Sequence, residues 1–175
     1  MGTAGNSLIK GIDIQEIIKT LDSFHAQSWL IMHFSLALKN RLEGQAAFFL
    51  SKELDDKAEE SMKHAKKLAQ RIAELGGTET ADPTRFVDVS KLSQFSMPSS
   101  TSDIKVILSY VLEQEQSIIR KYGEFMTKIR DKDDLTYHLI RDILEDEVRA
   151  ESEIETVLSA SKDPEFNERQ RPKSS

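Results

Sequence analysis

The sequence contains no cysteine, which excludes disulfide bonds, thiolate metal sites and thiol catalysis. Glycine and proline are scarce, at seven and four residues in a chain of 175, so long uninterrupted helices are allowed. No apolar run reaches the roughly 18 residues that a membrane-spanning helix needs, and the first residues lack the apolar core of a signal peptide. We therefore expect a cytoplasmic protein with no membrane partner.

Basic residues do not gather into an arm or patch, and the net charge is −6. Nucleic-acid binding relies on such positive surfaces, so we expect no nucleic-acid partner. Charged residues make up 31% of the chain and hydrophobic residues 38%, a balance typical of a globular helical protein. The length suits a single domain that buries a full core.

The most periodic stretch of the chain is residues 53–77. Apolar and small residues recur there at steps of three and four, which indicates one buried face of an α-helix: Leu54, Ala58, Ser61, Met62, Ala65, Leu68, Ala69, Ile72 and Leu75. Gly76 and Gly77 should end this helix, because glycine tolerates positive φ. The buried face carries one polar residue, Ser61, and His64 lies three residues further on.

The same periodicity predicts helices at residues 13–42, 45–75, 102–132 and 133–160, with Asp13 and Ser102 as N-terminal caps. Residues 76–101 form a long crossover with a short helical turn near 89–92. We predict an all-α fold, an antiparallel four-helix bundle over residues 13–160. An N-terminal arm (1–12) precedes it, and a disordered tail (161–175) follows.

The second half of the first helix, residues 29–38, is apolar nearly all round. A helix of a small bundle normally keeps one face in water, so this half needs a second covering surface. We expect a homo-oligomer that uses the first helix and the apolar pair Phe48 and Phe49 as contacts.

One polar residue falls on the inward face of each helix at about the same level: Ser28, Ser61, Glu115 and Glu147. A buried ionised carboxylate without a partner is very costly. Glu115 and Glu147 must therefore pair with a cation, take up a proton or bind a metal ion.

Three segments carry a family resemblance: SMKHAKKLAQRIAELGG (61–77), EQSIIRKY (115–122) and ILEDEVRAESEIETVL (143–158). Together they resemble the ferritin-like superfamily, especially bacterioferritin and the Dps-like ferritins, over roughly residues 8–160. The resemblance implies a ferritin-like bundle, iron binding or storage, and assembly into an oligomer.

The resemblance also assigns six positions that hold a di-iron ferroxidase centre in the family. Three keep the family's ligand: His64, Glu115 and Glu147. Three have lost it: Ser28 and Ser61 in place of Glu, and Ala150 in place of His. Because ferroxidase chemistry needs two adjacent irons, we expect an incomplete centre without ferroxidase activity.

Two interpretations of the retained residues stay open. In one, His64 holds a carboxylate and the two serines supply hydrogen bonds, so the cluster needs no metal. In the other, His64, Glu115 and Glu147 bind a single, weakly held iron. Glu60 and Glu113 are conceivable replacement ligands, but on a helix they point about a quarter-turn away and should be solvated or paired.

Met62 stands in the run Met62-Lys63-His64-Ala65, which resembles a haem-binding run of bacterioferritin. A methionine at helical spacing more often serves in core or interface packing, so the haem assignment competes with an ordinary one.

Three functions follow as hypotheses. The first is an iron-storing cage subunit with an incomplete ferroxidase centre, alone or together with an intact ferritin-like subunit. The second is a structural or interaction bundle that has lost metal binding. The third is a bundle that binds one metal ion or haem.

Overall fold

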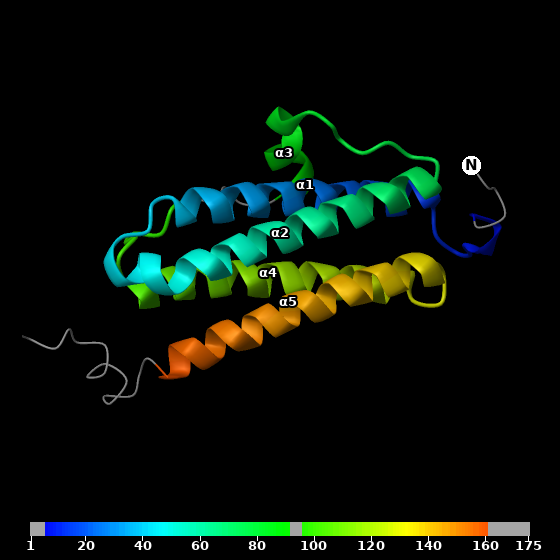
Figure 1. The fold of residues 1–175 in the computed structure, drawn as a ribbon. Helices are drawn as coiled ribbons and strands as arrows, with labels where there is room; N and C mark the ends of the chain where they lie inside the picture. The colour runs from blue at the N-terminus through cyan, green and yellow to red at the C-terminus, as the bar shows by residue number, and fades with distance from the viewer. Residues whose placement is uncertain (1–5, 92–95, 161–175) are drawn as a thin grey trace, which may run out of the picture.

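The computed structural model describes residues 6–91 and 96–160. Its long helices form two antiparallel hairpins, one above the other in Figure 1: α1 (Ile14–Lys39) with α2 (Gly44–Glu74), and α4 (Ile104–Ile129) with α5 (Asp134–Ala160). The described residues form helices and loops and contain no strand. The predicted all-α, antiparallel four-helix bundle is confirmed. No described helix combines the length and the apolar character needed to cross a membrane.

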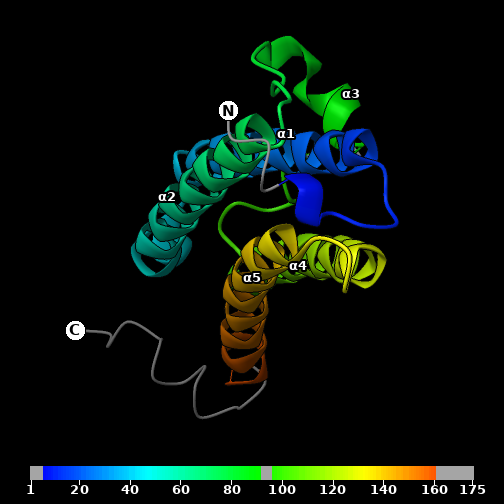
Figure 2. The same ribbon diagram turned by 90° about the vertical axis from the view of Figure 1, so that its right-hand side faces the viewer.

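The crossover between α2 and α4 carries a short 3-10 helix, η2 (Pro83–Arg85), followed by α3 (Phe86–Ser90). Figures 1 and 2 show α3 on the side of α1 that faces away from α4 and α5. Thr80 fastens the crossover to α1, because its backbone N–H and its hydroxyl donate to Asp22 at 2.7 and 2.8 Å. The helical turn expected near residues 89–92 begins earlier, and residue 92 lies outside the described residues.

Aspartates cap the N-termini of α1 and α4. Asp13 accepts a hydrogen bond from the N–H of Gln15 at 3.0 Å, as predicted. For α4 the prediction of Ser102 is wrong. The residue that directly precedes the helix is Asp103, whose carboxylate accepts from the N–H groups of Lys105 and Val106. A carboxylate at this position satisfies two free donors and complements the helix dipole.

The C-terminus of α2 needs its two glycines for different reasons. Gly76 has φ +87°, a conformation that side chains disfavour. The N–H of Gly77 donates to the carbonyl of Ile72 at 2.9 Å and closes the helix end. A Cβ atom at Gly77 would lie 2.8 Å from the side chain of Ile18, so this glycine lets α2 end against α1.

Apolar residues pack in two clusters that leave polar residues between them. The larger cluster joins all four long helices and contains Ile17, Leu21, Phe24, Leu68, Ile72, Ile118, Tyr122, Ile140 and Ile143, among others. The smaller one contains Phe34, Leu38, Ala46, Leu50, Leu54, Ile107 and Leu108. Ser61 and His64 of α2 and Glu115 of α4 fall between these clusters, in the middle of the bundle.

A second buried polar group ties the end of α2 to the start of α5. The guanidinium of Arg71 donates to the carboxylate of Asp133 at 3.0 and 3.2 Å and to the hydroxyl of Thr136 at 2.9 Å. The charges are paired and the group joins two helix ends, so its role is structural.

The part of the N-terminal arm that the structure describes contacts the bundle. After the 3-10 helix η1 (Asn6–Leu8), Ile9 and Ile12 pack against the larger apolar cluster. The N–H of Lys10 donates to the carbonyl of Lys132 at 3.0 Å. The predicted tail, residues 161–175, lies outside the described residues.

Candidate functional site

The inward-facing polar residues meet in the middle of the bundle, as the spacing predicted. Ser28, Ser61, Glu115 and Glu147 are each 2% exposed. The serines do not hold the carboxylates. Ser28 donates to the carbonyl of Phe24 at 2.9 Å, and the hydroxyl of Ser61 has no hydrogen-bond partner among the described residues.

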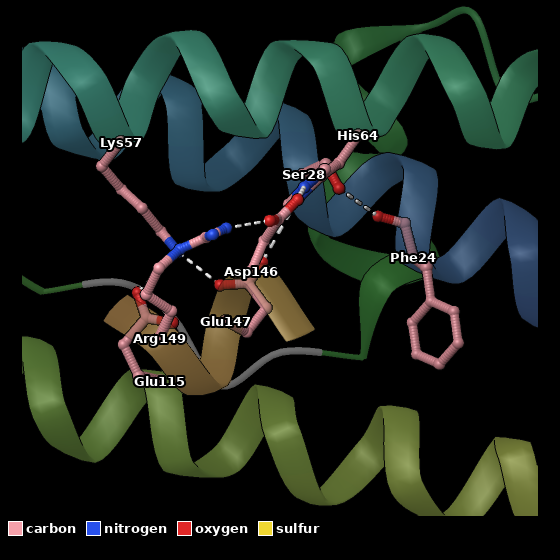
Figure 3. Close-up of polar contacts among 8 residues, drawn as sticks. All are labelled: Phe24, Ser28, Lys57, His64, Glu115, Asp146, Glu147 and Arg149. Carbon is pink, nitrogen blue, oxygen red and sulfur yellow. Dashed lines mark hydrogen bonds and ion pairs between the residues drawn. The ribbon is translucent and has the colours of Figure 1, made fainter. Parts of the chain in front are cut away.

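The cation of this site is Lys57 of α2, which we did not predict from the sequence. Its Nζ lies 2.8 Å from Oε1 of Glu115 and also donates to Oε2 of Glu147 (Figure 3). The side chain is only 12% exposed. The signal was present in the spacing, because Lys57 precedes Ser61 by four residues and His64 by seven and so shares their helix face.

The pKa values of the three central charged groups shift in different directions. Burial alone would lower the pKa of Lys57, but its two acidic neighbours raise it above the usual value. Burial would raise the pKa of Glu147, but Lys57 and His64 together lower it below the ordinary range. Burial raises the pKa of Glu115 to about 8, with Lys57 opposing and Glu147 adding to the rise. Lys57 and Glu147 therefore favour their charged forms, whereas burial favours the protonated form of Glu115.

The contacts continue from Glu147 toward the surface of α5. Oε1 of Glu147 lies 3.4 Å from Nδ1 of His64, and Nε2 of the same ring lies 3.2 Å from Oδ2 of Asp146. The other carboxylate oxygen of Asp146 accepts from Arg149. Acids and bases alternate along this row of contacts, which links Glu115, Lys57, Glu147, His64, Asp146 and Arg149 in that order (Figure 3).

A cavity of about 1100 Å³ lies beside the row, between the two hairpins. Apolar side chains from all four long helices line it, including Phe34, Leu54, Leu108 and Ile154. The polar part of its wall contains Lys57, Glu60, Glu115, Asp146 and Arg149. The central charges therefore border a space that small ions and water can enter.

The residues proposed from the sequence are thus partly brought together. His64 and Glu147 touch, and Lys57 connects Glu147 to Glu115. That these residues hold a metal ion stays a prediction. Met62 is partly buried on α2, and its assignment to haem stays a prediction as well. Sequence reasoning missed Lys57 and Asp146, which form ion pairs with the predicted ligands. Lys57 pairs with Glu115 and Glu147, and Asp146 contacts His64.

Comparison with known proteins defines the class to which this fold belongs. The family described as "Ferritin-like domain" matches residues 18–162, which is most of the chain. The chain belongs to the ferritin-like family.

Individual similar proteins include both Dps-type and bacterioferritin-related members. The DNA protection during starvation protein of Pyrococcus furiosus is 28% identical over 149 residues, which cover 85% of this chain and 80% of that protein. A dodecameric thioferritin, the bacterioferritin-related protein from Bacteroides fragilis, superposes with a TM-score of 0.80 at 22% identity over 92% of this chain and 94% of its own. Dps from Listeria monocytogenes gives 0.75 at 12% identity, over 86% and 96%. The structural likenesses establish the fold alone.

Proposed function

We propose that this chain is an iron-binding or iron-storing subunit of a ferritin-like oligomer that has no working di-iron ferroxidase centre inside its bundle. Membership of the ferritin-like family supports the iron-handling part. The position of Lys57 between Glu115 and Glu147 is the single observation that carries the rest.

The residues in the middle of the bundle do not fit a pair of irons. A di-iron centre needs carboxylates that reach both metals and further ligands on either side. Here the ammonium of Lys57 already lies 2.8 Å from Glu115 and binds Glu147 as well. A metal ion in that space would meet a positive charge at close range, where repulsion is strong.

The three positions that lost their family ligands supply no replacement metal ligand. Ser28 and Ser61 present hydroxyl groups, and Ala150 presents only a methyl group. Neutral hydroxyls bind divalent metals far more weakly than carboxylate and imidazole groups do. Storage would then depend on acidic surfaces of the oligomer or on an intact ferritin-like subunit that assembles with this one.

The iron chemistry can be measured directly. When Fe(II) is added without oxygen and oxygen follows, we expect iron oxidation at about the rate of buffer alone and no rapid di-ferric absorbance. Slow mineral growth on the protein would agree with surface nucleation. A fast di-ferric phase within the first turnover would contradict the proposal.

Self-association is the second part of the proposal. Phe48 and Phe49 at the start of α2 are 81% and 47% exposed, and Leu36 on α1 is 39% exposed. Large apolar side chains exposed to this extent favour a covered interface. The similar protein from Bacteroides fragilis is described as dodecameric.

Particle mass tests the assembly. We expect the mass of two or more chains of 19.9 kDa each at micromolar concentration. The double variant Phe48→Glu/Phe49→Glu should shift the chain to smaller species, because charges are costly in an apolar contact. Val87→Glu, at an exposed apolar residue of α3, is the control and should leave the mass unchanged. A monomer of the unmodified chain would be the contradicting result.

The alternative function is a structural or interaction bundle without metal. The network of Lys57, Glu147 and His64 favours it, because the central carboxylates are neutralised without any ion. Iron retained per particle after loading separates the two functions: storage requires many irons per oligomer, and a purely structural bundle retains none. The expectations of no nucleic-acid partner and of a cytoplasmic location stay predictions.

A further inference from the structure

We infer that Glu60, His64 and Asp146 form a binding site for one divalent transition-metal ion, on the outer side of the row of alternating charges. All three ligands come from one chain, so the site depends neither on assembly nor on iron storage. It is also separate from the Lys57 site, because it uses the other nitrogen of His64 and two different carboxylates.

The three side chains are close enough to share an ion. One ligand atom from each lies within 4.8 Å of the others. Metal bonds of about 2.0–2.2 Å to nitrogen and oxygen keep neighbouring ligand atoms about 3.0–3.6 Å apart. Nε2 of His64 and Oδ2 of Asp146 already have this spacing, at 3.2 Å. Only Glu60, a flexible and partly buried side chain, must move to complete the set.

The environment of His64 prepares its Nε2 as a ligand. The ring is 2% exposed, so packing fixes its plane. Its Nδ1 lies 3.4 Å from the carboxylate of Glu147, which can hold the Nδ1 proton. With the proton there, the lone pair of Nε2 points toward Asp146. A carboxylate behind a metal-binding imidazole is the arrangement that fixes the tautomer and raises the basicity of the ligand.

Asp146 is oriented in a similar way. Arg149 binds its Oδ1 and leaves Oδ2 toward His64. Glu60 and Asp146 both line the 1100 Å³ cavity, which provides access for an ion and room for water ligands. One imidazole and two carboxylates suit zinc, Fe(II), Co(II) or Mn(II).

Cobalt(II) is the probe that tests the site, because its visible bands report an imidazole and carboxylate environment. Titration of the full chain should give one Co(II) per chain by calorimetry and by absorbance. Glu60→Gln and Asp146→Asn should each weaken binding about tenfold or more. Glu59→Gln removes an exposed carboxylate one residue away and should leave the affinity unchanged.

A second variant separates this site from the Lys57 site. Glu115→Gln should not change Co(II) affinity, since Glu115 contacts Lys57 and is not one of the three ligands. Loss of binding in Glu115→Gln would place the ion in the middle of the bundle and overturn the inference. Absence of stoichiometric binding, or full binding in both ligand variants, would overturn it too. These results are independent of iron oxidation, so the proposed function can fail while the site stands. Circular dichroism confirms that each variant is folded.

Discussion

Lys57→Met should lower the free energy of unfolding by about 3–5 kcal/mol at pH 7, because it leaves a buried carboxylate without its cation. Methionine has a similar length and apolar stem, so the change removes the charge more than the packing. Glu147 bears the loss, since it is ionised in the native protein and contacts Lys57 directly. Urea denaturation followed by circular dichroism measures the difference.

The deficit, which is the loss in the free energy of unfolding caused by Lys57→Met, depends on pH in a predictable direction. In the native protein the pKa of Glu147 is lowered from its ordinary value of 4.5. This shift stabilises the fold at pH values above 4.5, and the stabilisation is lost as the pH falls through the pKa of the folded state. In the variant the cation is absent, and burial raises the pKa of Glu147. The folded variant then takes up a proton before the unfolded chain does. The deficit should therefore shrink as pH falls from 7 toward 5.

Two controls isolate the charge effect. The double variant Lys57→Met/Glu147→Gln removes both charges and should recover much of the stability at pH 7. Lys52→Met removes an exposed lysine of the same helix, whose partner is Asp56, and should change stability little. If Lys57→Met behaved like Lys52→Met, the ammonium would not be holding the central acids.

Restoring the lost ligands should create a di-iron centre only when Lys57 is also removed. The variant Ser28→Glu/Ser61→Glu/Ala150→His regains the family's ligand types, but its ammonium still lies between the central carboxylates. We expect it to bind fewer than two irons per chain. Adding Lys57→Ala should allow two irons and a rapid di-ferric absorbance when oxygen is added.

Iron per chain and stopped-flow absorbance measure this second prediction. Two irons bound with Lys57 in place would show that its ammonium moves aside readily. A folded four-site variant that binds no iron pair would show that the family ligand positions were assigned incorrectly to this chain. The unmodified chain and the single variant Lys57→Ala complete the comparison.

Helix periodicity was sufficient to predict the fold. The helices α2, α4 and α5 are strongly amphipathic, and α1 carries a regular buried stripe although its second half is apolar nearly all round, so the positions of these helices follow from burial. The end of α2 at Gly76 and Gly77 was also predictable, because a positive φ favours glycine. The cap of α4 was not, since Ser102 and Asp103 are both good caps and only the chain path selects between them.

For the two acids at the centre of the site, the sequence left three alternatives open. Two buried acids had to pair, take up a proton or bind a metal, and in the structure both contact the ammonium of Lys57. Lys57 was overlooked because a lysine on an amphipathic helix is usually solvated. Its long apolar stem lets the ammonium reach the core from the edge of the stripe.

The positions of Glu60 and Asp146 beside the cavity do not follow from the sequence, for a different reason. Each stands one residue before an inward position, which on an isolated helix points toward solvent. Both side chains instead line the cavity between the hairpins and are partly buried. Periodicity within one helix carries no information about such a gap between hairpins.

Anomalous diffraction from crystals soaked in Fe(II) without oxygen at neutral pH would decide most directly what neutralises the buried acids. The predicted result is Nζ of Lys57 between Glu115 and Glu147, with no metal peak between these two side chains. A pair of iron peaks there, with the lysine turned away, would contradict it.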